Sequence, residues 1–255
     1  MQTNTYPAPN IIIQQAYLAY KNIALFNDFN LTISANKCTC LLGPSGVGKS
    51  TLLRMIANLM TTHTQFKGNI YSDNNRPLVQ QISYMAQTDL LMPWLSALDN
   101  TLLSFKLQNK LTPQIIQRAE ELLKEVGLQK VMHHYPNELS GGMRQRVALV
   151  RTLLQDKPIV LMDEPFSNLD AITRFQLQTL ASTLLKNKTV LLITHDPLEA
   201  LLLADEIYIL SGRPAVLSQP VHLTSATPRD LSDPDVVAYQ AILFHALLQA
   251  KENSV

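Results

Sequence analysis

The sequence predicts an α/β fold with a parallel sheet that is interrupted by a helical insertion. Compact apolar runs at Ile159–Met162 and Thr189–Thr194 are typical of buried parallel strands, and a helical pattern over Ala171–Leu185 separates them. Between about Asp89 and Glu138 the strand signal stops and helical spacing replaces it. This strand–helix–strand order with one helical interruption favours a parallel sheet that carries an inserted helical part.

The first third of the chain is predicted to consist mainly of strands. β-Branched and apolar residues favour strands at Ile11–Tyr17, Leu31–Ile33 and Cys38–Leu42, and a further strand at Ile82–Ala86. After Cys38–Leu42 the apolar residues change to helical spacing, which predicts a helix from Lys49 to about Met60.

Three helices are expected in the middle of the chain and one near its end. Ser96–Lys106, Thr112–Val126 and a segment from Gly142 to Gln155 have helical spacing, and the second begins with a threonine cap and a first-turn proline. The segment Ser211–Pro234 is proline-rich and polar, and a helix over about 234–250 follows it. Its apolar residues recur at helical spacing, so we expect it to pack on the domain; a partner-binding helix is the alternative.

Composition and charge exclude several classes of protein. Lys and Arg total 21 and Asp and Glu total 20 in 255 residues, a balance that lacks the basic field of general nucleic-acid binding. No apolar run approaches the roughly 18 residues of a membrane-spanning helix, and Met1–Asn10 lacks the features of a signal peptide. Cys38 and Cys40 are too close along a strand for an unstrained disulfide, so we expect two small buried residues. We therefore expect a soluble, intracellular protein.

A glycine-rich loop lies between the strand Cys38–Leu42 and the predicted helix. With the first helical residues it comprises Gly43, Pro44, Ser45, Gly46, Val47, Gly48, Lys49, Ser50 and Thr51. Glycines let consecutive backbone N–H groups curl round a phosphate, and the helix N-terminus adds partial positive charge. In this pattern Lys49 reaches the β- and γ-phosphates, and the Ser50 hydroxyl ligates Mg²⁺. The alternative is a plain glycine-rich turn; the lysine, the serine and both flanking elements favour a nucleoside triphosphate site.

Two adjacent carboxylates follow the apolar strand Ile159–Met162. Asp163 and Glu164 come at its carboxyl end, which is where open α/β sheets bind ligands. We expect Asp163 to hold the Mg²⁺ shell and Glu164 to orient and deprotonate the attacking water. Acidic residues are common in turns, so this pair alone would be weak evidence for a catalytic site. Together with the phosphate loop it becomes strong evidence.

A third motif indicates which class of nucleotide-binding protein the chain resembles. The segment Leu139–Arg146, with the sequence LSGGMRQR, lies between the phosphate loop and Asp163. With it, the chain resembles the ATP-binding-cassette (ABC) family over nearly its whole length. The family's adenine-stacking aromatic, Q-loop glutamine, D-loop and switch histidine are matched in order by Tyr20, Gln87, Ser167–Asp170 and His195.

The resemblance implies the fold of that family. This is a P-loop NTPase cassette with a RecA-like parallel-sheet core, an N-terminal antiparallel β subdomain and an inserted helical subdomain. We expect one such domain over residues 1–255. Its core would comprise about 10–88 and 157–220, its helical subdomain about 89–156, and its C-terminal helix about 234–250.

The resemblance also implies how the motifs divide the chemistry. The signature residues that open the helix after Leu139 are Ser140, Gly141 and Gly142. Their N–H groups would form a second anion site. In the family that site closes over the γ-phosphate held by a second copy of the subunit, so hydrolysis requires dimerisation. Glu164 would be the general base, His195 would contact the γ-phosphate, and Gln87 would touch Mg²⁺ and the water.

Three of these polar and aromatic positions have structural alternatives. Tyr20 has Tyr17 nearby and could be a core aromatic instead of an adenine platform. His195 follows a buried strand and could be a structural histidine. His133 and His134 are adjacent, face different ways and have no third ligand, so we expect surface residues and not a metal site.

The segment after Gln87 indicates the kind of transporter. Its residues Leu91–Trp94, LMPW, resemble cassette subunits of importers for nitrate, sulfonates, taurine and the pyrimidine precursor of thiamine. In that group the segment helps to form the groove for a coupling helix of the membrane subunit. Pro93 and Trp94 would be a rigid apolar anchor there; the alternative is that Trp94 caps the helical core.

The resemblance therefore implies an ATPase that energises a bacterial importer of a small solute. Its partners would be a second copy of itself, integral-membrane permease subunits and, indirectly, a periplasmic or lipid-anchored solute-binding protein, with no nucleic acid. It would lie peripherally at the cytoplasmic face of the inner membrane. Two alternatives stay open: an ABC ATPase of an exporter or lipoprotein-extracting complex, and a phosphoryl-transfer enzyme that is active as a monomer.

Overall fold

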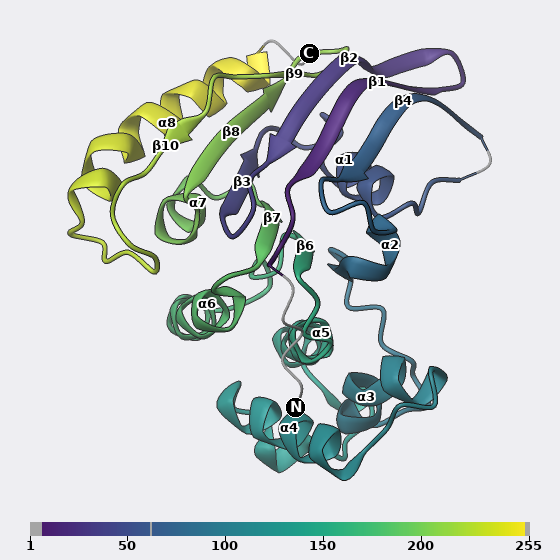
Figure 1. The fold of residues 1–255 in the computed structure, drawn as a ribbon. Helices are drawn as coiled ribbons and strands as arrows, with labels where there is room; N and C mark the ends of the chain where they lie inside the picture. The colour runs from purple at the N-terminus through teal and green to yellow at the C-terminus, as the bar shows by residue number, and fades with distance from the viewer. Residues whose placement is uncertain (1–6, 62, 253–255) are drawn as a thin grey trace.

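The computed structural model describes residues 7–61 and 63–252. An antiparallel sheet, a larger mainly parallel sheet and a separate helical part confirm the predicted α/β fold class (Figure 1). The prediction that Met1–Asn10 is not a signal peptide concerns mainly residues 1–6, which lie outside the described residues. Among the described residues, no helix combines the length and the apolar character that crossing a membrane requires.

The antiparallel sheet contains three strands in the order β2-β1-β4. They are β1 (Ile11–Tyr20), β2 (Ile23–Ile33) and β4 (Thr64–Ser72). The register between β1 and β4 shifts at a bulge between Gln14 and Tyr17. Gly68 lies opposite this bulge with φ +102°, and a Cβ there would lie 2.6 Å from the Gln15 carbonyl oxygen. The close approach of the two backbones therefore requires glycine at this position.

The larger sheet has seven strands in the order β10-β8-β3-β7-β6-β5, with β9 paired to β8. The strands from β8 to β5 run parallel, whereas β9 and β10 pair with β8 in the antiparallel sense. Parallel neighbours place their carboxyl ends at one edge of the sheet, so the segments after β3, β6, β7 and β8 meet there. The strands are β3 (Cys38–Leu42), β5 (Ile82–Met85), β6 (Ile159–Asp163), β7 (Thr189–Ile193), β8 (Glu206–Ser211), β9 (Val216–Leu217) and β10 (Val221–His222).

The helices fall into a group around the parallel sheet and a group set apart from it. Figure 1 shows α3 and α4 at one end of the molecule, and α8 along the outside beside β8 and β10. The helices are α1 (Lys49–Ile56), α2 (Leu78–Gln81), α3 (Ala97–Leu107), α4 (Pro113–Glu125), α5 (Gly141–Leu154), α6 (Ala171–Leu185), α7 (Pro197–Leu203) and α8 (Pro234–Glu252), with 3₁₀ turns at Gln129–Val131 and Pro136–Glu138.

Two hydrophobic cores lie on the two faces of the parallel sheet. Along β3 the buried side chains alternate, so that Cys40 and Leu42 belong to the core shared with the helical part and Leu41 to the core shared with the antiparallel sheet. β6 and β7 are buried at every position, as predicted for parallel strands. Cys40 is buried, Cys38 is half-buried, and both are free thiols. Burial raises the pKa of both thiols, which favours their role as small apolar residues.

The structure corrects several of the predicted elements. The helix that begins at Lys49 ends at Ile56 instead of Met60, because Asn58 adopts a left-handed conformation with φ 57°. β4, α7 and β8 are not predicted from the sequence, and β2 begins at Ile23, well before its predicted segment. β4 is largely exposed and polar, so it lacks the apolar pattern by which strands are predicted.

Candidate functional site

The phosphate loop connects the carboxyl end of β3 to α1. Gly43, Gly46 and Gly48 have positive φ angles of 156°, 81° and 115°. At Gly43 a Cβ would lie 2.5 Å from the carbonyl oxygen of Leu210 on the neighbouring strand β8. Glycine is therefore required for the close contact between loop and strand. The loop's other residues are Pro44, Ser45 and Val47, and α1 begins with Lys49, Ser50 and Thr51.

Lys49 lies folded into the phosphate loop and is only 6% exposed. Its Nζ donates hydrogen bonds to the carbonyl oxygens of Gly43, at 2.7 Å, and Pro44, at 3.0 Å. Burial lowers the pKa of Lys49, and the negative charges of Glu164 and Asp163 oppose this effect. The loop thus holds an ammonium group at its centre, near the two carboxylates at the carboxyl end of β6.

Asp163 is the last residue of β6 and is 2% exposed. Burial raises the pKa of its carboxyl group, while a hydrogen bond with the Ser50 side chain acts in the opposite direction. Within the described part of the chain, the buried Oδ1 of Asp163 has no hydrogen-bond partner. Mg²⁺ prefers oxygen ligands, and here an unpaired carboxylate oxygen of Asp163 lies close to the hydroxyl of Ser50. Ser50 and Asp163 therefore fit this ion.

Glu164 directly follows β6 and has a left-handed backbone with φ 49°. This uncommon conformation is held by its N–H, which donates to the Ile193 carbonyl at 2.8 Å, and by its carbonyl, which accepts from Gln145 Nε2 at 3.0 Å. Its Oε2 accepts a hydrogen bond from Gln87 Nε2 at 3.2 Å, and its Oε1 lies 3.3 Å from His195 Nδ1. The structure therefore brings together the three side chains predicted to be catalytic.

The buried amide of Gln145 links two loops of the site, and no role is predicted for this residue from the sequence. It lies on α5, is 4% exposed, and its Oε1 accepts a hydrogen bond from the Asn168 N–H at 3.0 Å. Together with its bond to the Glu164 carbonyl, this amide joins the signature helix to both the carboxylate loop and the D-loop segment. Its sequence signal is its place in the LSGGMRQR motif, but the contacts depend on tertiary packing.

The signature residues form the N-terminus of α5. The Ser140 hydroxyl caps the helix by accepting a hydrogen bond from the Met143 N–H at 3.2 Å. A Cβ on Gly142 would lie 3.1 Å from the Asn168 carbonyl oxygen, whereas one on Gly141 would meet only the Arg144 side chain at 3.9 Å. The signature is thus packed against the D-loop, while the glycines of the phosphate loop are packed against β8 and β2. The two anion-binding loops have separate surroundings within the chain.

The remaining predicted residues lie at the margins of this site. Tyr20 ends β1 and packs, half-buried, against the core that includes Val47 of the phosphate loop. His195 follows β7, and its side chain is 60% exposed even though it approaches Glu164. His133 and His134 are both exposed, as predicted for surface residues.

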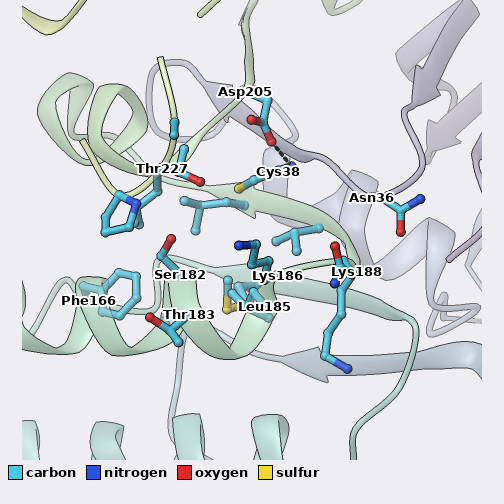
Figure 2. A pocket seen from close by; sticks show the side chains of 18 residues that line it. Asn36, Cys38, Phe166, Ser182, Thr183, Leu185, Lys186, Lys188, Asp205 and Thr227 are labelled. Atoms are coloured by element: carbon cyan, nitrogen blue, oxygen red, sulfur yellow. Dashed lines mark hydrogen bonds between the residues drawn. The ribbon is translucent and has the colours of Figure 1, made fainter. Parts of the chain in front are cut away.

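A cavity of about 430 Å³ lies away from the predicted site. Figure 2 shows its lining residues Cys38, Asp205, Lys186 and Lys188, with the hydrogen bond from the Cys38 N–H to Asp205. Asn36 precedes β3, Lys186 and Lys188 precede β7, and Asp205 precedes β8, so this side of the cavity lies at the amino ends of the parallel strands. None of the residues that line it is a predicted site residue.

A comparison with protein families decides the assignment. A family model described as ABC transporter matches residues 26–167. The chain belongs to the ABC transporter family. It is an ATP-binding cassette that binds and hydrolyses ATP, as the motifs predicted.

Curated relatives resemble the cassette over almost its whole length. It is 42% identical over 238 residues to an uncharacterized ABC transporter ATP-binding protein of Haemophilus influenzae, which covers 92% of this chain and 97% of the relative. It is 41% identical over 234 residues to the aliphatic sulfonates import ATP-binding protein SsuB 1 of Rhodococcus jostii, covering 91% of this chain and 90% of that protein.

A solved structure resembles the cassette in three dimensions. It is the dimeric, post-hydrolysis state of the ATP-binding cassette MJ0796 bound to ADP and Pi, with a TM-score of 0.73 and 29% sequence identity. The match covers 85% of this chain and all of the other.

Proposed function

We propose that this cassette is the ATP-hydrolysing subunit of an importer for sulfonates or chemically similar small solutes. The observation that carries the hydrolytic assignment is the placement of Glu164, whose carboxylate contacts both Gln87 and His195 beside Lys49 and Asp163. The transport assignment is supported by several relatives named as aliphatic sulfonate import proteins, among them those of Rhodococcus jostii and Pseudomonas syringae, at 41% and 37% identity.

The residues of one chain divide the chemistry of hydrolysis. Lys49 and the N–H groups of the phosphate loop bind the β- and γ-phosphates. Ser50, Asp163 and Gln87 would hold Mg²⁺, which when bound neutralises phosphate charge and orients the triphosphate. Glu164 orients the attacking water and takes up its proton, and His195 contacts the γ-phosphate.

The site is completed by a second copy of the chain. Ser140, Gly141 and Gly142 present the N-terminus of α5, a ready anion site that is packed against the D-loop and not against the chain's own phosphate loop. In the proposed dimer, this helix end binds the γ-phosphate held by the partner, and Tyr20 stacks on the adenine. ATP would then close the dimer, and loss of the γ-phosphate would release it.

An exposed apolar segment next to Gln87 supports docking to a permease. The Trp94 side chain is 70% exposed and Leu90 is 59% exposed, so Trp94 does not fill the helical core. Large exposed aromatic residues of this kind are typical interface anchors. We assign the segment Leu91–Trp94 to a membrane permease, with a solute-binding protein as an indirect partner and the cytoplasmic face of the membrane as the location.

The composite-site mechanism is tested with Glu164→Gln. The substitution removes the base but keeps the shape, so the variant should lose hydrolysis and change from monomer to dimer when ATP and Mg²⁺ are added. Size-exclusion chromatography with light scattering measures the change, and Glu121→Gln, on the exposed face of α4, is the matched control. Hydrolysis strictly linear in enzyme concentration, with no dimer under any condition, would contradict the mechanism.

A test of whether the cassette serves import or export requires the membrane permease. The cassette, purified together with its permease and placed in lipid nanodiscs, should hydrolyse ATP faster when a solute-binding protein loaded with an alkanesulfonate is added. Stimulation without any binding protein, or only by a lipoprotein, would favour the exporter or lipoprotein-extracting alternative.

A further inference from the structure

The turn between β8 and β9 lies directly against the phosphate loop. β8 is the parallel neighbour of β3, so its carboxyl end lies at the same edge of the sheet as the loop. The Leu210 carbonyl lies 2.5 Å from the position of a Cβ on Gly43. Two residues beyond the end of β8, Nη2 of Arg213 lies 3.7 Å from the position of a Cβ on Gly46. An arginine side chain therefore reaches the middle of the phosphate loop from the β8 side.

The backbone that carries Arg213 is anchored on both sides. Ser211 pairs with Val216 in the β8–β9 ladder, and the Ala215 N–H donates to the Leu25 carbonyl at 2.7 Å. Leu25 in turn packs against Gly48 of the phosphate loop, 3.1 Å from the position of a Cβ there. The turn and the loop are thus held in a fixed relation by β2.

The Arg213 side chain has no internal role that would explain its position. It is exposed, and within the described part of the chain it makes no hydrogen bond or ion pair. The other arginines beside the site differ in this respect: Arg144 pairs with Asp89, and Arg174 pairs with Asp196. A guanidinium without a protein partner on a rigid turn is available to a ligand in the loop.

The charges around the loop are unevenly distributed. Asp163 ends β6, Glu164 follows it and His195 comes after β7, so all three lie on one side of β3. On the β8 side the group that approaches the loop is the guanidinium of Arg213. A bound triphosphate carries more negative charge than Lys49 and one divalent cation neutralise, and guanidinium groups form strong forked hydrogen bonds to phosphate oxygens.

We propose that Arg213 is a nucleotide-binding residue that contacts the phosphates of ATP and ADP from the β8 side of the phosphate loop. The proposal rests on the ATP-binding role of the loop and adds a second cation to it. Because the contact is made within one chain, it applies to the monomer and needs neither the signature of a partner nor hydrolysis.

The test measures binding of fluorescent N-methylanthraniloyl ADP and ATP to the purified full-length chain with Mg²⁺. Arg213→Gln should weaken binding of both nucleotides about tenfold, because a charge-assisted contact is lost. Arg213→Lys should retain part of the affinity, because the charge remains without the fork. Lys186→Gln is the matched control: it removes one positive charge near the cavity at the opposite edge of the sheet and should bind as the wild type does.

The outcomes separate this proposal from the proposed function. A wild-type chain that binds neither nucleotide would refute the ATPase assignment itself. Wild-type affinity in Arg213→Gln, or equal weakening in Lys186→Gln, would overturn the role of Arg213 while leaving that assignment intact. Normal ADP and ATP binding by Arg213→Gln, with loss of the ATP-driven dimer in the Glu164→Gln background, would place the contact across the dimer and also overturn it.

Discussion

Replacing Gln145 by methionine tests whether the signature helix holds the catalytic carboxylate in place. The side chain is 4% exposed, donates to the Glu164 carbonyl at 3.0 Å and accepts from the Asn168 N–H at 3.0 Å. Methionine fills the same space but leaves two part-buried backbone groups, the Glu164 carbonyl and the Asn168 N–H, without this partner. A buried group left unpaired costs about 1–3 kcal/mol, and both groups are only part-buried, while the Glu164 carbonyl keeps a bond from the Ser167 hydroxyl at 3.1 Å. We therefore expect a loss of about 1–3 kcal/mol in the free energy of unfolding.

Urea unfolding followed by circular dichroism measures this loss, and ATP hydrolysis measures its effect on Glu164. The matched control is Gln155→Met at the end of the same helix, where the side chain makes one bond of 3.3 Å to the Arg151 carbonyl within α5. That control should change stability by less than about 0.5 kcal/mol. Equal stability losses in the two variants, or unchanged hydrolysis in a destabilised Gln145→Met, would refute the reasoning that this amide positions Glu164.

Two further predictions follow from the packing around the same site. Gly142→Ala should destabilise the chain by about 1 kcal/mol and reduce hydrolysis, because its Cβ would lie 3.1 Å from the Asn168 carbonyl oxygen. Gly141→Ala is the control and should leave the free energy of unfolding unchanged. Equal effects of the two substitutions on the urea midpoint would contradict this prediction. Glu199, buried on α7 beside Asp196, has its pKa raised to about 8, chiefly by burial and then by the Asp196 charge. The folded state therefore keeps a proton that the unfolded chain releases above its ordinary pKa of 4.5, so stability should fall by about 1.4 kcal/mol per unit as pH rises from about 5 to 8. Glu199→Gln should remove this contribution, and identical pH slopes in the two proteins would exclude it.

The parts of the fold that are predicted correctly are those determined by residues within the same segment of sequence. β6 and β7 are buried on both faces, so apart from Asp163 and Thr189 at their ends every residue is apolar, which is the pattern by which buried parallel strands are predicted. The phosphate loop is specified by glycines that need positive φ, and by a lysine and a serine at fixed positions. The pair Asp163 and Glu164 follows from a buried strand that ends at the ligand-binding edge.

The features that are not predicted depend on contacts with residues elsewhere in the chain. β4 is mostly exposed and is stabilised by pairing with β1, so its own residues carry little apolar signal. The left-handed backbone of Glu164 depends on its hydrogen bond to the Ile193 carbonyl and on one from the Gln145 side chain, and both residues are distant in sequence. Arg213 lies in a segment that composition marks only as polar and proline-rich, and its approach to Gly46 depends on β8 being the neighbour of β3.

The contacts of Glu164 also explain how a hydrolytic site can respond to partners on two different surfaces. Gln87 reaches the carboxylate from the segment that carries Trp94, while Gln145 reaches the Glu164 backbone from the helix that begins with the signature. In the proposed assembly, a displacement at either surface would be transmitted to Glu164 through one hydrogen bond, of 3.2 Å from Gln87 or 3.0 Å from Gln145. Each such bond contributes only about 0.5–1.5 kcal/mol, but coupling between sites typically amounts to 1–3 kcal/mol. In the proposed assembly, two bonds to one strained residue would therefore be sufficient to make hydrolysis depend on both the membrane partner and the second copy.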